Sequence, residues 1–319
     1  MILAGPTLAK VGCEVGGRYG GTMGPIQQWS RRGVLASVGA LGLSACGKKN
    51  DPAKTETKAA QKVGPDTIET AVAGDWRLPA DRARDLWRHP VESLKFWELK
   101  PGQTVVEFWP GAGWYTDILA PFLADTHGKL YEAVLQADDP SEPAAAEIVE
   151  GYRRKLTEKK KIYGEVTFTA FGPTSGPVAP AGTVDLVLFL RNLHNWMAGG
   201  IAEKAFKDAL AALKPGGILG VEEHRGEPGR VQDVLAADGY VQQDYVIQMA
   251  KEAGFVLAGT SEINANPKDT KDHPFGVWTL PPTRLSSPRG EPAEPGFDHA
   301  KYDAIGESDR MTLKFVKPK

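Results

Sequence analysis

From about residue 76 onward, short apolar runs rich in β-branched residues alternate with longer stretches in which apolar positions recur every three or four residues. The short runs predict strands and the longer stretches predict helices. The expected strands cover residues 104–108, 129–135, 166–171, 184–190, 218–223, 255–263 and 311–316. The expected helices cover residues 81–94, with an interruption around Pro90, and 114–123, 144–160, 201–213 and 244–253.

This alternation is typical of an α/β domain with a doubly wound, mostly parallel sheet, which we expect over residues 76–319. The run at 184–190 is almost continuously apolar, as a strand buried on both faces requires. A proline-rich segment, residues 264–310, stands before the last strand. It has two interpretations, an elaborated hairpin that covers the ligand end of the sheet or a surface insertion.

The first 45 residues have the pattern of an export signal. Arg31 and Arg32 precede a charge-free apolar stretch, residues 33–45. This stretch is too short to span a bilayer, which takes about 20 apolar residues, but it suits a signal-peptide core. The order of these features resembles a twin-arginine signal joined to a lipoprotein cleavage box, in which Cys46 receives the lipid. Met23 is a second candidate for the start of the protein.

Residues 46–75 are expected to form a flexible linker. As far as about Val63 they are rich in Lys, Thr, Ala and Glu and show no apolar periodicity. We therefore expect a globular domain anchored by lipid to the periplasmic side of a bacterial membrane. Gly47 after the cysteine slightly favours the outer membrane.

Composition narrows the class of protein. Of 319 residues, 41% are hydrophobic and 24% charged, which is ordinary for a soluble globular protein. Lys and Arg (38) nearly balance Asp and Glu (40), so no basic field predicts a nucleic-acid partner. Cys13 and Cys46 both precede the expected domain, which excludes a disulfide scaffold or cysteine-bound zinc within it. The spacings around His127 and His273 match no metal motif, so we expect no metal.

In open parallel sheets, ligands bind beyond the carboxyl ends of the strands. Three polar or glycine-rich segments occupy that position: EFWPGAG at 107–113, RNLHNW at 191–196 and EEHR at 222–225. The glycines of the first segment allow the backbone to approach a ligand, and the helix that follows offers free N–H groups. These three loops are therefore the expected site.

Together these stretches resemble the class I S-adenosylmethionine-dependent methyltransferases over roughly residues 101–223. VVEFWPGAG is similar to the acidic residue and glycine loop of that family, residues 185–196 to its fourth-strand motif, and LKPGGIL to the turn into its fifth strand. More narrowly, WPGAGWYTDILAP, RNLHNW, HPFGVWTLPP and ESDRMTLKFVKP resemble a group of predicted bacterial methyltransferases that often carry export signals. The resemblance implies a Rossmann-like sheet and S-adenosylmethionine as cofactor.

The resemblance implies cofactor contacts, with three departures from the family pattern. Trp109 stands where the family has its first loop glycine. The ribose-binding carboxylate would fall near Val134, and Glu132, on the same side of its strand, is the candidate substitute. Phe171 replaces an acidic residue near the adenine and could stack on it. The full set of expected cofactor residues is Glu107, Trp109, Gly111, Gly113, Glu132, Phe171, Arg191 and Asn192.

His194 and His224 are the catalytic candidates, because a histidine with its ordinary pKa near 6.5 is largely neutral at pH 7 and can take a proton from a nucleophile. The alternative is a histidine satisfied by backbone at a helix start. The neighbouring aromatic and charged residues could line a substrate cleft. Equally, the aromatic residues could belong to the core and the charged residues to an internal ion-pair cluster. These substrate candidates are Trp114, Tyr115, Trp196, Glu223 and Arg225.

Two functional hypotheses follow. The first is methylation of a small molecule or envelope component, for which alignment of nucleophile and activated methyl group supplies much of the rate. The second is a catalytically degenerate binding protein of the cell envelope, which both the departures from the family pattern and the export signal favour, because S-adenosylmethionine is made in the cytoplasm.

Overall fold

The computed structural model describes residues 64–138 and 143–319. The expected signal peptide and Cys46 lie outside the described residues. Within the described part, no helix is both long and apolar enough to cross a membrane.

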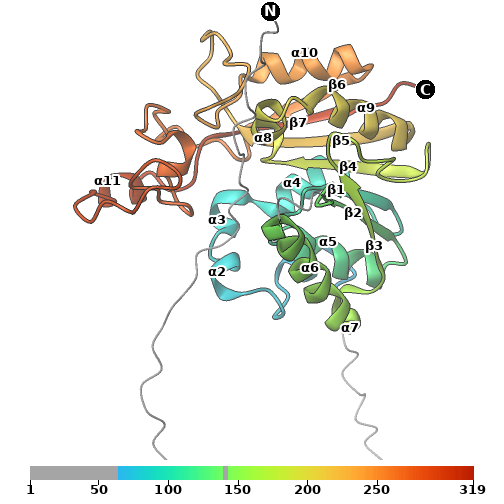
Figure 1. Ribbon diagram of the computed structural model, residues 1–319. Coiled ribbons are helices and arrows are strands. Elements are labelled where there is room, and N and C mark those ends of the chain that lie inside the picture. Colours follow the sequence, from blue (N-terminus) through green and yellow to red (C-terminus); the bar gives the residue numbers. More distant parts are fainter. Residues whose placement is uncertain (1–63, 139–142) are drawn as a thin grey trace, which may run out of the picture. The chain divides into compact units, whose positions relative to one another are not determined.

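Seven strands form one sheet in the order β3–β2–β1–β4–β5–β7–β6 (Figure 1). Strands β1 to β5 run parallel, and β7 is antiparallel to both of its neighbours. The order reverses between β1 and β4, which places the ligand crevice of such a sheet at their carboxyl ends. The bounds are β1 Thr104–Phe108, β2 Lys129–Leu135, β3 Val166–Phe171, β4 Val184–Leu190, β5 Leu213–His224, β6 Val256–Ser261 and β7 Arg310–Val316.

Helices cover both faces of the sheet (Figure 1). Residues of α1, α4, α5, α6 and α7 pack on one face and residues of α8, α9 and α10 on the other. The doubly wound, mostly parallel fold expected from the sequence is confirmed. The helix bounds are α1 Ile68–Val72, α2 Pro79–Arg82, α3 Asp85–Arg88, α4 Pro90–Phe96, α5 Thr116–Asp125, α6 Pro143–Glu158, α7 Lys160–Tyr163, α8 Leu193–Ala198, α9 Ala202–Ala212 and α10 Gln243–Ala253.

The N-terminal helices differ from the expected single element. His89 adopts a left-handed conformation (φ 38°) and separates α3 from α4, which begins at Pro90. Proline is favoured at this first position because it has no N–H to leave unpaired. Helix α1 buries Ile68 and Ala71 in the same core as α5. The folded domain therefore includes residues 64–75, which the sequence pattern placed in the linker.

The indole of Trp97 fills the core between α4 and the sheet. It is fully buried and donates a hydrogen bond from Nε1 to the carbonyl of Leu313 at 2.9 Å. Gly220 of β5 lies against this ring, and a Cβ placed there would sit 2.6 Å from Trp97 Cγ. The close approach of strand and indole thus depends on glycine.

We expect Gly220→Ala to lower the free energy of unfolding by about 1–3 kcal/mol, because the buried indole must shift to admit the methyl group. Gly151→Ala is the matched control. A Cβ at Gly151, inside α6, meets nothing within 4 Å, so alanine should stabilise by about 0.5–1 kcal/mol through helix propensity. Urea unfolding of both variants measures the difference. Equal effects would contradict the packing described.

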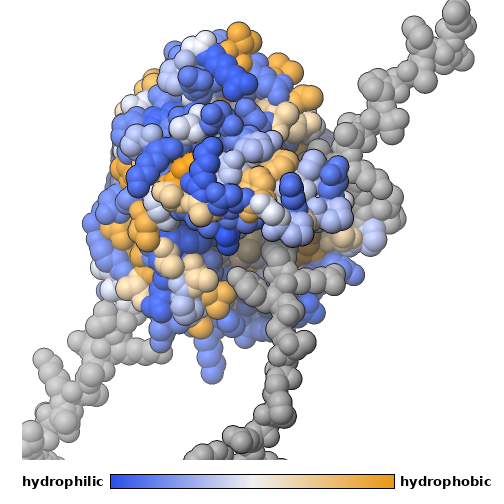
Figure 2. Space-filling model, turned by 90° about the vertical axis from the view of Figure 1, so that its left-hand side faces the viewer, coloured by the Kyte–Doolittle hydropathy of each residue, from blue (hydrophilic) through white to orange (hydrophobic). Residues whose placement is uncertain are grey.

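The proline-rich segment before β7 contains a short 3-10 helix, η1 Gly276–Thr279, and α11 Ala300–Asp303. It is anchored at the carboxyl end of β5: Tyr240 donates a hydrogen bond to Asp269 at 3.0 Å, and the ring of Trp278 lies 5.9 Å from that of His194. Of the two interpretations, the structure supports the one that covers the ligand end of the sheet. The surface on this side of the domain is mostly hydrophilic, with hydrophobic residues scattered over it (Figure 2).

Candidate functional site

The loops after β1, β4 and β5 meet at the carboxyl edge of the sheet, because these three strands are adjacent. They form three neighbouring features. One is an apolar pocket beside α6, the second is a cluster of guanidinium groups, and the third is a pair of imidazoles.

The apolar pocket is open to the backbone of the glycine loop. Gly111 has φ 61°, and a Cβ there would meet nothing within 4 Å, so the pocket can admit a ligand close to the main chain. Asn192 donates from Nδ2 to the carbonyl of Trp109 at 2.9 Å and thereby ties the β4 loop to the β1 loop. The pocket is lined by Trp109, Pro110, Gly111, Val134, Leu135, Ile148, Val149, Tyr152 and Asn192.

Trp109 keeps a glycine-like backbone, with φ 46°. Such left-handed conformations are costly for residues with a Cβ. The indole Nε1 donates to the carbonyl of Phe171 at 2.9 Å, which holds the ring over the end of β3. The loop therefore has the backbone conformation that a glycine would adopt, and the indole of Trp109 adds an aromatic wall to the pocket.

Glu107 and Glu132 face each other across β1 and β2 and are both buried. Thr116 donates to Glu107 at 2.8 Å. The Glu132 carboxyl lies near the hydroxyls of Thr116 and Tyr152, which favour its ionised form less than burial opposes it. Burial raises the pKa of Glu107 to about 7, and burial together with the Glu107 charge raises the pKa of Glu132 well above its usual range. Val134, and not Glu132, lines the pocket. The two carboxyls thus lie beneath the pocket floor.

Phe171 and Trp196 lie in the core. Both are fully buried, with ring centroids 5.4 Å apart, and Trp196 also packs edge-on against Phe108 and Phe189. Neither ring faces a ligand space, so the core interpretation describes these two side chains. From the sequence alone, an aromatic residue on an apolar face cannot be assigned to the core rather than to a ligand cleft.

Trp114 and Tyr115 are buried as well, but they contact charged groups. The guanidinium groups of Arg77 and Arg88 lie 5.1 Å and 4.7 Å from the Trp114 ring centroid. The Tyr115 hydroxyl donates to Glu222 at 2.9 Å. Both aromatics therefore support the guanidinium cluster.

In that cluster, the carboxylates of Glu222 and Glu307 are the partners of four guanidinium groups. Arg310 pairs with Glu222 at 2.8 Å, and Glu307 pairs with Arg84 at 2.6 Å, with Arg88 at 3.0 Å and with Arg310 at 3.4 Å. The cluster thus carries an excess of positive charge, which favours binding of an anion. Its guanidinium groups belong to Arg84, Arg88, Arg191 and Arg310.

Arg191 is the least satisfied member. Its Nε is buried without a hydrogen bond and lies 3.7 Å from the nearest Glu222 oxygen. Burial lowers the pKa of its guanidinium, and its backbone is left-handed, with φ 58°. The next residue, Asn192, lines the apolar pocket. Arg191 of the cluster and Asn192 of the pocket are thus consecutive residues of the loop after β4.

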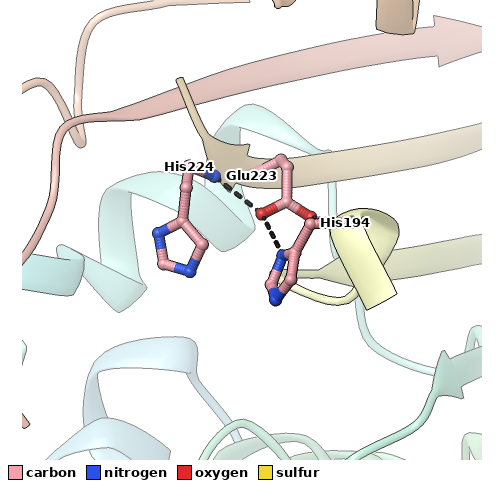
Figure 3. A group of neighbouring side chains, drawn as sticks. All are labelled: His194, Glu223 and His224. Atoms are coloured by element: carbon pink, nitrogen blue, oxygen red, sulfur yellow. Dashed lines mark hydrogen bonds and ion pairs between the residues drawn. The ribbon is translucent and has the colours of Figure 1, made fainter. Parts of the chain in front are cut away.

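The imidazole pair stands at the ends of β4 and β5 (Figure 3). His194 Nδ1 lies 2.9 Å from Glu223 Oε1, and His224 Nδ1 lies 2.5 Å from Ser308 Oγ. The rings are 5.3 Å apart and extend in the same direction. Burial lowers the pKa of His224 well below its usual value, and the nearby charges of His194, Arg191 and Arg310 lower it further.

Glu223 is the organising carboxylate of this pair. Its Oε2 accepts from the backbone N–H groups of Leu193 (2.7 Å) and His194 (3.3 Å), and Oε1 accepts from that of His224 (2.8 Å). It therefore satisfies free N–H groups at the start of α8 while it orients the His194 ring. One ligand atom from each of His194, Glu223 and His224 lies within 4.8 Å of the others, a grouping able to hold a metal ion.

Arg225, by contrast, pairs with Asp309 and with Glu262, both at 2.8 Å. It forms the internal ion pairs that the sequence left as one of two alternatives. Gly113 has φ 85° and a Cβ there would contact Tyr152 at 2.9 Å, so it shapes the start of α5 without lining the pocket.

The structure thus brings together Trp109, Gly111 and Asn192 in the pocket, and His194, Glu223 and His224 in the imidazole pair. Sequence reasoning missed Ser308 and Arg310, which reach the site from the far end of the proline-rich segment. The only signal for them was the closing ESDRMTLKFVKP stretch, which the family resemblance includes. It also missed Trp278, in the HPFGVWTLPP stretch.

No protein-family model and no curated protein sequence matches the chain. Solved structures do resemble it. An S-adenosylmethionine-dependent methyltransferase from Aquifex aeolicus is 20% identical, with a TM-score of 0.46 over 64% of this chain and 94% of that one. The cyclase SpnF is 18% identical, with a TM-score of 0.45 over 77% and 83%.

A third structure, phosphoethanolamine N-methyltransferase 2 from Haemonchus contortus in complex with S-adenosyl-L-methionine, is 15% identical, with a TM-score of 0.43 over 73% of this chain and 53% of that one. The strand order and the antiparallel strand β7 define the fold of this chain as a Rossmann-like α/β fold with a doubly wound, mostly parallel sheet.

Proposed function

We propose that the protein is an S-adenosylmethionine-dependent methyltransferase acting on a small molecule or an envelope component. The observation that carries the proposal is the junction of the apolar pocket with the under-neutralised guanidinium cluster, at the point where the strand order reverses. A ligand with a flat ring at one end and a carboxylate at the other fits that junction, and S-adenosylmethionine carries an adenine ring and a carboxylate.

The residues present fit the cofactor at both ends. The apolar walls around Gly111 and Val149 suit an adenosine group, and the unbonded Nε of Arg191 belongs to a side chain suited to a carboxylate. When bound, S-adenosylmethionine supplies an activated methyl group. The protein's part is then to hold the acceptor in line and to exclude water.

In this proposal, His194 and His224 lie on the side of the methyl acceptor and have the catalytic roles expected from the sequence. His194 is 5% exposed and held by Glu223, so its orientation is fixed before any ligand arrives. Trp278 lies against it and limits the access of water.

The proposed location is the periplasmic side of a bacterial membrane, with a lipid on Cys46 and the outer membrane slightly favoured. The Arg31-Arg32 pair, the apolar stretch and the small residues before Cys46 support it. The proposed partners are a small-molecule or envelope substrate and the membrane. The nearly balanced charge gives no support to a nucleic-acid partner.

A second candidate function, a catalytically degenerate binding protein, is favoured by one specific observation. The pocket wall at the end of β2 consists of Val134 and Leu135, and Glu132 lies buried below it. Among the described residues that line the pocket, none is a carboxylate able to bind ribose hydroxyls.

Calorimetric titration of the full chain with S-adenosylmethionine and with its demethylated product tests the proposal. We expect one site per chain. Arg191→Met should weaken binding about 10- to 100-fold, because it removes a charge-assisted hydrogen bond. Arg82→Met, at an exposed position of α2, is the control and should bind like the parent.

The outcomes separate the two candidates. Absence of binding in a chain shown to be folded would contradict both the cofactor and the methyltransferase function. Binding of the cofactor without methyl transfer to any of a panel of envelope extracts and small nucleophiles would favour the degenerate binding protein.

A further inference from the structure

We propose that His194 and His224 form a site for a divalent transition-metal ion at the acceptor side of the cleft. The site itself follows from the geometry of the two imidazoles. Only its use, to hold and activate a methyl acceptor, rests on the proposed function. The spacing of histidines along the sequence predicted no metal, and this inference departs from that expectation.

The first step concerns the free nitrogens. Each ring has its Nδ1 occupied by an oxygen, Glu223 Oε1 for His194 and Ser308 Oγ for His224. Within residues 64–138 and 143–319, no hydrogen bond reaches either Nε2. A neutral imidazole that donates from Nδ1 keeps its Nε2 lone pair available to a metal.

The second step concerns the carboxylate. A metal-binding histidine commonly donates its other N–H to a carboxylate, which fixes the tautomer and raises the basicity of the ligand nitrogen. Glu223 is placed for this role and is unsuited to a direct one, because its two oxygens already accept three backbone N–H groups and the His194 ring.

The third step concerns distance. A zinc–nitrogen bond is about 2.1 Å long, so two imidazoles on one ion lie at most about 4 Å apart at their nitrogens. One nitrogen of each ring and a Glu223 oxygen lie within 4.8 Å of one another. Both rings extend in the same direction (Figure 3), and a shared ion requires the two Nε2 atoms to approach within about 4 Å of each other while each Nδ1 keeps its oxygen partner.

The surroundings decide which ion fits and what completes its shell. Imidazole nitrogen suits Zn²⁺, Co²⁺, Ni²⁺ and Cu²⁺ and does not suit Mg²⁺ or Ca²⁺. With two protein ligands, the ion keeps open positions, as catalytic sites do. Arg191 and Arg310 add positive charge near His224, which opposes the ion alone, so a tight site requires hydroxide or another anionic ligand in those open positions. The acceptor class that follows is one whose hydroxyl or thiol can bind the ion as an anion.

The test uses the full chain, stripped with a chelator and titrated with Zn²⁺ and Co²⁺ in the absence of S-adenosylmethionine. We expect a site that His194→Gln and His224→Gln each weaken at least tenfold, while Glu223→Gln weakens it about 10- to 100-fold. His127→Gln, an exposed histidine near the opposite edge of the sheet, is the control and should leave affinity unchanged.

A measurement on the unmodified chain guards against variants that fail to fold. One equivalent of Cu²⁺ should give an electron paramagnetic resonance spectrum with coupling to two imidazole nitrogens. Equal metal affinity of the parent and the His194→Gln and His224→Gln variants would overturn the proposal, as would a copper spectrum without that coupling. Cofactor titration is done without metal, so either proposal can fail while the other stands.

Discussion

Replacing Arg310 with methionine is expected to lower the free energy of unfolding by about 3–5 kcal/mol. The guanidinium is 1% exposed and pairs with Glu222, which is fully buried, at 2.8 Å. It also donates to the carbonyl of Trp87 at 2.6 Å. Methionine leaves the Glu222 carboxylate in the core with only the Tyr115 hydroxyl within hydrogen-bond distance. Urea unfolding at pH 7 measures the loss.

Two further variants test whether the loss of stability comes from the buried ion pair. Arg230→Met removes an exposed arginine that lies 3.8 Å from Asp238, and it should change stability by less than about 0.5 kcal/mol. Adding Glu222→Gln to Arg310→Met should recover part of the loss, since the unpaired charge is then gone. A loss below about 1 kcal/mol for Arg310→Met alone would show that the buried pair does not hold the site together.

Replacing Glu132 with glutamine is expected to stabilise the protein at pH 8 and to change its stability little at pH 4. The pKa of Glu107 is raised to about 7, and that of Glu132 is also raised, from an ordinary value of 4.5. Between pH 4.5 and 7 the folded chain therefore binds more protons than the unfolded chain. Stability consequently falls as the pH rises through this window.

Glutamine cannot ionise, so the folded chain no longer has to keep a buried acid protonated at this position, while the amide can still donate a hydrogen bond to Glu107. Thermal unfolding from pH 4 to pH 8 should show a flatter profile for Glu132→Gln than for the parent chain. Glu147→Gln, at an exposed position of α6, is the control and should leave the profile unchanged. A Glu132→Gln chain less stable than its parent at pH 8 would mean that the hydroxyls of Tyr152 and Thr116 outweigh burial in setting the ionisation of Glu132.

The strands could be predicted from the sequence almost residue by residue. β1, β2, β3 and β4 have the bounds that their apolar runs predict, because buried parallel strands are continuous in hydrophobicity. β5 begins earlier, at Leu213, since the Lys-Pro-Gly-Gly turn is itself paired as extended chain with residues at both sides. The position of the site followed from the strand order, which the alternation implies.

The roles of single side chains were harder to predict. The alternation of side chains along a strand correctly placed Glu132 on the same side as Val134. It could not predict that Val134 lines the pocket while Glu132 is buried beneath it. An apolar pattern likewise cannot tell a core ring such as Trp196 from a cleft ring. Contacts between distant segments, such as Ser308 with His224, leave no local signal.

The position of β7 has a consequence for how the chain is made. The last strand of the sequence lies between β5 and β6, and β6 pairs with β7 alone among the described strands. While the chain is still being synthesised, β5 has one unpaired edge and β6 has no partner. Exposed strand edges of this kind favour aggregation of unfinished chains. The sheet can therefore close only once β7 has emerged, and the emergence of an N-terminal half is not enough.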